Sequence, residues 1–74
     1  ITPNPAANQI TITSSQSFTN ATITIYSITG QILFSLKNIN SKEQIIDINK
    51  FANGVYYVEM KQLTSKEIAK FIKE

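Results

Sequence analysis

The stretch ATITIYSITGQILFSLK, residues 21–37, predicts two strands joined by a tight turn. Ile23 and Ile25 alternate with threonines, which is the period of two expected for a strand with one buried face. Gly30 lies in ITGQ, residues 28–31, and glycine readily adopts the positive φ that tight turns require. The stretch therefore predicts an antiparallel hairpin, and with it an all-β fold.

Side-chain parity assigns faces to the two strands of this hairpin. We expect Ile23 and Ile25 to point into the core from the first strand. The core-facing residues expected in the second strand are Ile32, Phe34 and Leu36, with Leu33 outside. Tyr26 and Ile28 have the opposite parity to the isoleucines before them. This change predicts a bulge, a bend or burial on both faces near the turn.

Similar short strands recur on both sides of the hairpin. They are QITITS at 9–14, IIDI at 45–48 and VYYVEMK at 55–61. Asn53-Gly54 closes the turn before the last of them, which then places Tyr56, Val58 and Met60 on one face. One strand every 8–12 residues, separated by turn residues, is typical of a sandwich or barrel. Six strands are clear, and a seventh is expected near Phe18 or Ile39.

The last segment, KEIAKFIKE at 66–74, fits two structures. As a helix it has a capping box, Thr64 with Glu67, and an apolar stripe at i, i+3 and i+4 from Ile68. As a strand it alternates, with these residues on its two faces: Ile68 and Ile72 on one, Ala69 and Phe71 on the other. Because every other segment reads as β, we interpret residues 67–73 as the final strand.

Size and composition limit the kind of protein. The chain has 74 residues and no cysteine, so we expect one small domain, residues 1–74, held together by apolar packing alone. A proline-rich opening, residues 1–8, resembles the exit of a linker and suggests a domain from the end of a longer protein. No apolar run approaches the roughly 20 residues that a membrane helix needs.

The charge pattern argues against nucleic acid as a partner. Seven lysines and no arginine stand against five acidic residues, which gives a net charge of +2. The lysines are scattered singly from Lys37 to Lys73, whereas nucleic-acid proteins concentrate basic residues on one face and interleave aromatics. We therefore expect a solvated surface of mixed charge.

Catalytic and metal-binding residues are scarce. Histidine and cysteine, the commonest general base and the best nucleophile, are both absent. The carboxylates show no spacing typical of a calcium loop, and Asp47, between Ile46 and Ile48, is read as a solvent-facing strand residue. Only Gly30 and Gly54 are glycines, so no phosphate-binding loop is present. We expect no enzyme and no cofactor.

Four blocks carry a family resemblance. They are PNP at 3–5, IYSITGQIL at 25–33, FANGVYYVEM at 51–60 and KFIK at 70–73. In this order and at these distances they resemble the C-terminal sorting domain of the type IX secretion system of Bacteroidota. That family typically has a PNP opening, an IYDxxGxxV-like strand pair, an LxxGxYxxxI-like block and a lysine-rich final strand. Ser27 replaces the usual aspartate, so no role is carried over to this position.

The resemblance implies an immunoglobulin-like antiparallel sandwich of about seven short strands that works as a removable export signal. Its partners would be an outer-membrane shuttle protein and a sortase-like peptidase that cuts upstream of the domain. The cargo would pass through the periplasm to the cell surface or the medium. The residues expected to be recognised are Gly54, Tyr56, Lys70, Phe71, Ile72 and Lys73. Structural roles within the motifs fall to Pro3, Asn4, Pro5, Tyr26 and Gly30.

Other hypotheses remain open from the sequence. A small sandwich at the end of a secreted protein is also typical of a carbohydrate- or surface-binding module, which needs an exposed aromatic platform or a calcium site. A structural spacer is a third reading. Asn20 opens an Asn-x-Thr sequon, NAT, whose glycosylation requires a eukaryotic secretory route. An exposed last strand also predicts edge-to-edge pairing of two isolated copies.

Overall fold

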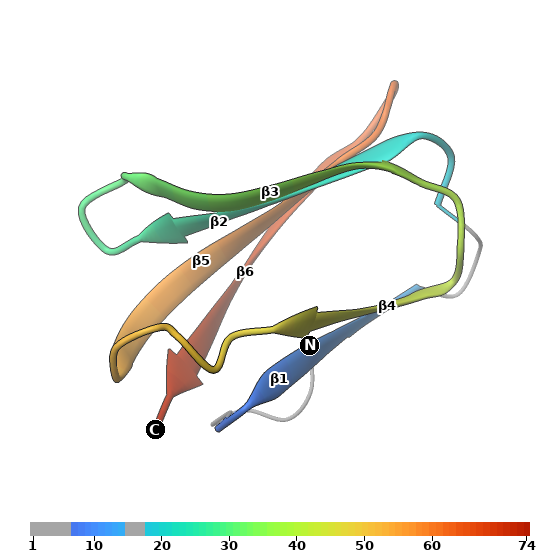
Figure 1. The fold of residues 1–74 in the computed structure, drawn as a ribbon. Coiled ribbons are helices and arrows are strands. Elements are labelled where there is room, and N and C mark those ends of the chain that lie inside the picture. Colours follow the sequence, from blue (N-terminus) through green and yellow to red (C-terminus); the bar gives the residue numbers. More distant parts are fainter. Residues whose placement is uncertain (1–6, 15–17) are drawn as a thin grey trace.

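A computed structural model describes residues 7–14 and 18–74 as a sandwich of two antiparallel sheets (Figure 1). The strands are β1 (Gln9–Thr13), β2 (Ala21–Ser27), β3 (Ile32–Ile39), β4 (Glu43–Asp47), β5 (Gly54–Lys61) and β6 (Lys66–Lys73). The described residues contain no helix with the length and apolarity that a membrane span requires. Pro3, Asn4 and Pro5 lie outside the described residues.

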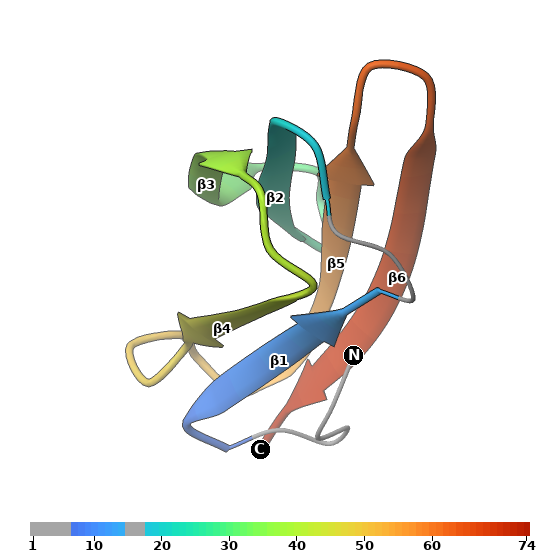
Figure 2. The same cartoon turned by 90° about the vertical axis from the view of Figure 1, so that its right-hand side faces the viewer.

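The strand order matches an immunoglobulin-like sandwich. One sheet has the order β3-β2-β5-β6 and the other pairs β1 with β4. These orders correspond to strands C′-C-F-G and B-E of the immunoglobulin fold. Figure 2 shows β3 above β4 on one side of the sandwich and β6 beside β1 on the other. The predicted all-β sandwich is confirmed, with six strands in the described residues: Ile39 ends β3 and Phe18 lies outside the strands.

The predicted hairpin is β2 and β3. Its turn is closed by two backbone hydrogen bonds: Ser27 N donates to Gln31 O at 2.9 Å, and Gly30 N donates to Ser27 O at 2.9 Å. Gly30 has φ +91°, a conformation that side chains with a Cβ rarely adopt. The positive φ expected of this glycine is therefore present.

One facing assignment in β3 is wrong. Ile25 pairs with Phe34, but the next residue, Tyr26, pairs with Ile32, so β3 has one extra residue at this point. This bulge shifts Ile32 to the face of Tyr26, where it is 61% exposed instead of buried. Phe34 and Leu36 pack against the core as expected. A second register shift lies between the pairs that Ala21 and Ile23 form with β3. Asn38 lies at this point with φ 60°, a left-handed conformation that asparagine adopts more readily than most residues.

The ambiguous C-terminal segment is a strand. β6 pairs with β5 along its whole length, from Lys61 opposite Lys66 to Gly54 opposite Lys73. The turn between them is closed by Gln62 N, which donates to Ser65 O at 2.8 Å. Thr64, the expected helix cap, lies in this turn, so the helical interpretation is excluded.

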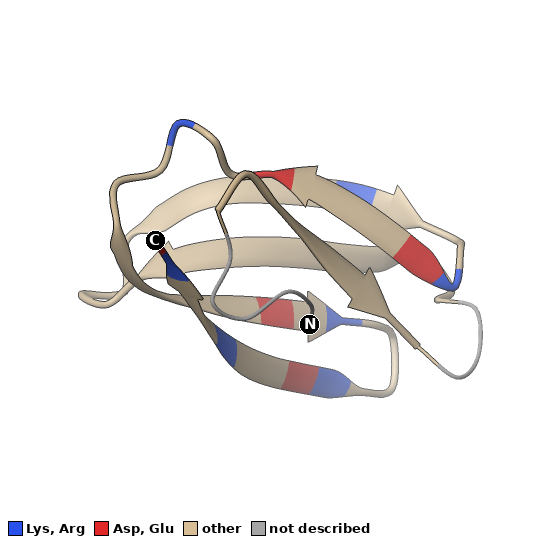
Figure 3. Ribbon diagram, turned by 90° about the horizontal axis from the view of Figure 1, so that it is seen from below, with Lys and Arg blue, Asp and Glu red and all other residues tan. Residues whose placement is uncertain are grey.

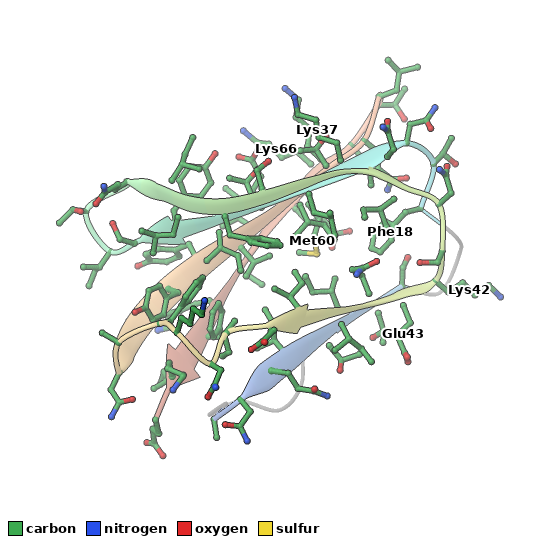
Figure 4. The ribbon with its side chains drawn as sticks, in the orientation of Figure 1. Phe18, Lys37, Lys42, Glu43, Met60 and Lys66 are labelled. Atoms are coloured by element: carbon green, nitrogen blue, oxygen red, sulfur yellow. The ribbon has the colours of Figure 1, made fainter. Side chains whose placement is uncertain are left out.

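The core lies between the two sheets and is built mainly from isoleucine. Its buried residues are Ile10, Ile12, Phe18, Ala21, Ile23, Ile25, Ile39, Ile46, Ile48, Tyr56, Val58, Met60 and Phe71. β-branched side chains suit this position because they pack well on a pleated surface. Figure 4 shows Phe18 and Met60 pointing into the space between the layers. Such a core leaves the outer faces of both sheets available for other roles.

Candidate functional site

The two blocks expected to be recognised lie side by side in the fold. Gly54 and Tyr56 lie at the start of β5, and residues 70–73 lie at the end of β6. These two groups meet because the two strands pair in antiparallel register. The pairs are Gly54 with Lys73, Val55 with Ile72, Tyr56 with Phe71, and Tyr57 with Lys70. We call these eight residues the terminal ladder. Figures 1 and 2 both place its C-terminal end beside the beginning of β1.

The inner row of the terminal ladder belongs to the core. Phe71 is fully buried and Tyr56 is 8% exposed. Their rings stack with centroids 5.4 Å apart and planes inclined by 22°, and the centroid of the Phe51 ring lies 5.1 Å from that of Tyr56. Lys73 follows on the same face and is also buried. This row fixes β6 onto the sandwich, because each large aromatic side chain that it contains buries a large apolar area.

Tyr56 also closes the loop before β5. Its hydroxyl donates a hydrogen bond to the backbone carbonyl of Ala52, four residues upstream, at 2.5 Å. This is the tyrosine corner of immunoglobulin-like folds, which occurs near the start of strand F. From sequence, Tyr56 was expected on one face with Val58 and Met60 and among the recognised residues, and this bond was not expected. The signal for it was the tyrosine two residues after the turn glycine, Gly54, whose φ is +155°.

Replacing Tyr56 by phenylalanine should therefore lower the free energy of unfolding by about 1 kcal/mol, the usual net contribution of one hydrogen bond. Urea denaturation of both proteins measures the difference. Tyr57→Phe is the matched control, because the Tyr57 side chain lies on the outer face, and it should change stability little. Equal effects of the two substitutions would contradict the role given to the Tyr56 hydroxyl.

The outer row of the terminal ladder is accessible. Lys70 is exposed and Ile72 is 38% exposed. Lys70 lies opposite Tyr57, and Tyr57 lies opposite Tyr26 on β2. A basic side chain and two tyrosines therefore follow one another across three strands of the outer face. The structure thus brings Tyr26, expected to have a structural role, onto the same surface as two of the residues expected to be recognised.

A shallow cavity of about 400 Å³ lies next to this row. It is lined by Tyr26, Tyr57, Ile68 and the turn residues 27–30. Ile28 and Ile68 are 67% and 61% exposed, so the cavity is bordered by accessible apolar groups. Sequence reasoning missed Tyr57, Ile28 and Ile68 as surface residues of one site. The adjacent residues Tyr56 and Tyr57 indicated only that one of the two rings would face outward, because successive side chains of a strand point to opposite faces.

The arrangement of charges gives binding chemistry rather than a metal centre. No group of three His, Cys, Asp or Glu residues within 7–14 and 18–74 is placed to hold a metal ion. Asp47 is exposed, and its Oδ1 accepts a hydrogen bond from Asn49 N at 2.8 Å, which confirms its assignment as a solvent-facing residue. Figure 3 shows acidic positions on β4 and both signs of charge on β5 and β6.

The fold and this surface define a small β-sandwich recognition module. The family model described as the secretion system C-terminal sorting domain matches residues 1–74, the whole chain, and the chain belongs to this family. Searches of curated proteins and of solved structures gave no match.

Family membership establishes what the domain is for. It is the C-terminal sorting signal of type IX secretion, and it interacts with the machinery of that system. Its cargo is secreted or displayed at the cell surface, and the tail is cleaved off. The family is not known as catalytic, and membership does not favour the carbohydrate-binding alternative.

Proposed function

We propose that the translocon recognises the outer row of the terminal ladder, while the inner row holds that row in place. The observation that supports this is the division of the ladder. Lys70 and Ile72 point outward, whereas Phe71, the residue between them in the chain, points inward and is fully buried. A receptor that contacts β6 from outside therefore reads alternate residues, with the aromatic stack behind them as a rigid support.

The remaining expected residues support this surface in different ways. Gly54 starts β5 with a backbone conformation that other residues strain to adopt, and it sets the register opposite Lys73. Tyr56 fixes the loop before β5 through its hydroxyl. Lys73 is buried on the inner face, a position that suits lysine because its long aliphatic part is apolar. We assign these residues to positioning the ladder.

The route of the cargo follows from the same proposal. The cargo crosses the inner membrane with an N-terminal signal and folds in the periplasm. An outer-membrane shuttle protein then receives the sandwich through the terminal ladder, and a sortase-like peptidase cuts upstream of it. Membership in the sorting family supports this order of events. The pairing of two isolated copies through β6 stays a prediction.

A photo-crosslinking experiment tests the recognition surface. A photoreactive phenylalanine analogue is placed at position 72, in a cargo that carries these residues in a Bacteroidota host. We expect a covalent product that contains the outer-membrane shuttle protein, identified by mass spectrometry. The expectation rests on Ile72, which is accessible on the outer row of the ladder.

Position 45 is the matched control for this experiment. Ile45 is 50% exposed on β4, in the other sheet, so it has similar accessibility but lies away from the ladder. The same product at equal yield from both positions would contradict recognition through the terminal ladder. So would products from position 72 that contain no translocon component.

A further inference from the structure

We propose that the outer face of the four-stranded sheet docks a protein surface that combines acidic side chains with a projecting apolar side chain. The inference rests on the proposed function and specifies the chemistry of the partner. It extends the contact surface beyond the terminal ladder, across β5 and β2 to the turn at 28–31. Two features of this face carry it: an excess of lysine and an adjoining aromatic cavity.

The lysine excess is a property of this face. Figure 4 shows Lys37 and Lys66 projecting from the side of the four-stranded sheet that faces away from β1 and β4. Lys61 lies opposite Lys66, and Lys70 lies opposite Tyr57, so both belong to the same face. Glu59 is the one carboxylate that the described strands place among these four lysines, so lysines outnumber carboxylates on this face.

The lysine arrangement itself is unfavourable without an anion. Lys61 and Lys66 face each other directly across β5 and β6, and like charges in this position destabilise a sheet. Glu59 relieves part of this repulsion, since its Oε2 lies 4.0 Å from Lys66 Nζ. Lys66 is 56% exposed, so this ion pair contributes little. An acidic partner would remove the remaining repulsion.

The opposite face of the sandwich has no such excess of positive charge. Among the residues of β1 and β4, the charged ones are Glu43 and Asp47, and both are exposed. Lys42 and Lys50 flank β4, so the two signs balance there and the chain, with a net charge of +2, separates its charge unevenly between the two faces. Such separation orients a partner before contact, because complementary potentials steer association and disfavour the wrong face.

The cavity beside the lysines determines the apolar part of the partner. Tyr26, Tyr57 and Ile68 border a hollow of about 400 Å³, which has room for one large side chain. Tyrosine side chains like those at this shallow hollow are enriched among the residues that contribute most binding energy in protein interfaces. The exposed Ile28 and Ile68 border this hollow, so a surface that contacts them and fills the hollow with one apolar side chain complements the face, as a folded protein surface can. We therefore favour a protein partner over an anionic lipid surface.

Binding of a defined peptide to the 74-residue chain tests the chemistry. The probe is a synthetic peptide in which one phenylalanine is flanked on both sides by glutamates. We expect it to shift the amide NMR signals of residues around Tyr26, Tyr57 and Ile68, with an affinity that falls as salt is raised. Lys61→Glu with Lys66→Glu should weaken binding about tenfold, because both changes place like charge against the probe.

Lys42→Glu with Lys50→Glu is the matched control pair. Each Lys→Glu change lowers the charge by two, so both double variants go from +2 to −2 overall. Only the first pair lies on the proposed docking face. Equal weakening by the two pairs, shifts centred on β1 and β4, or tighter binding of phosphatidylglycerol vesicles than of the peptide at the same residues would overturn the proposal.

Export separates this inference from the proposed function. A reporter that carries the unaltered chain should be exported, the Lys61/Lys66 variant about tenfold less, and the Lys42/Lys50 variant normally. Circular dichroism should show both variants folded. If the unaltered reporter and both variants are exported equally, the docking face is wrong and the sorting function stands. If the unaltered reporter stays in the periplasm, the proposed function itself fails.

Discussion

Replacing Phe71 by alanine is expected to lower the free energy of unfolding by about 3–5 kcal/mol. The ring is fully buried and stacks on Tyr56, so its removal leaves a cavity and takes away the partner of a second aromatic ring. A domain of 74 residues has a total stability of roughly 4–11 kcal/mol. One substitution near the end of the chain should therefore remove a large part of the stability of the whole sandwich.

Urea denaturation followed by tyrosine fluorescence measures this loss. Ile68→Ala is the control, because Ile68 lies three positions earlier on the same strand but is 61% exposed. It should cost less than about 1 kcal/mol. A Phe71→Ala protein with nearly unchanged stability would show that β6 is dispensable for the fold, which would contradict the role given to the inner row of the terminal ladder.

Alternation and turn residues were sufficient to predict the strands. Ile23 and Ile25, which were expected to point into the core, are buried, and Gly30 and Gly54 have the positive φ expected of them. These signals are local: a strand shows a period of two, and a turn needs a residue without a Cβ. The resemblance to the sorting family rested on the same blocks and is confirmed over the whole chain.

The C-terminal segment shows where local signals fail. A capping box at Thr64 favours a helix in isolation, but pairing with β5 satisfies the backbone of the whole segment and buries Phe71. Tertiary contacts override weak local preferences in such cases. Ile32 failed for a similar reason, because a bulge in one strand changes the facing of every residue beyond it and leaves no simple mark in the sequence.

The outer surface was the least predictable part of the site. Tyr26 and Tyr57 face the same way because β2 pairs with β5, and this pairing joins strands separated by two others in the chain. No local pattern specifies such an order. The pairing within the terminal ladder is easier to expect from the sequence, because β5 and β6 are consecutive strands joined by a short turn. Recognition by its outward residues stays a prediction.

The largest effect is expected from export of a reporter. A reporter enzyme with an N-terminal export signal is fused to residues 1–74 and produced in a Bacteroidota host, in strains with and without a working type IX translocon. A second fusion lacks residues 70–74. That deletion removes Phe71 from the core and Lys70 and Ile72 from the outer row, so both the fold and the recognition surface are lost.

The distribution of the reporter between the cell exterior and the periplasm is the most direct test of the domain as a sorting signal. We predict that the complete fusion reaches the surface or the medium only in the strain with a working translocon. The truncated fusion should stay in the periplasm in both strains. Retention of the complete fusion in the periplasm of the translocon-competent strain, or its export without the translocon, would contradict the account.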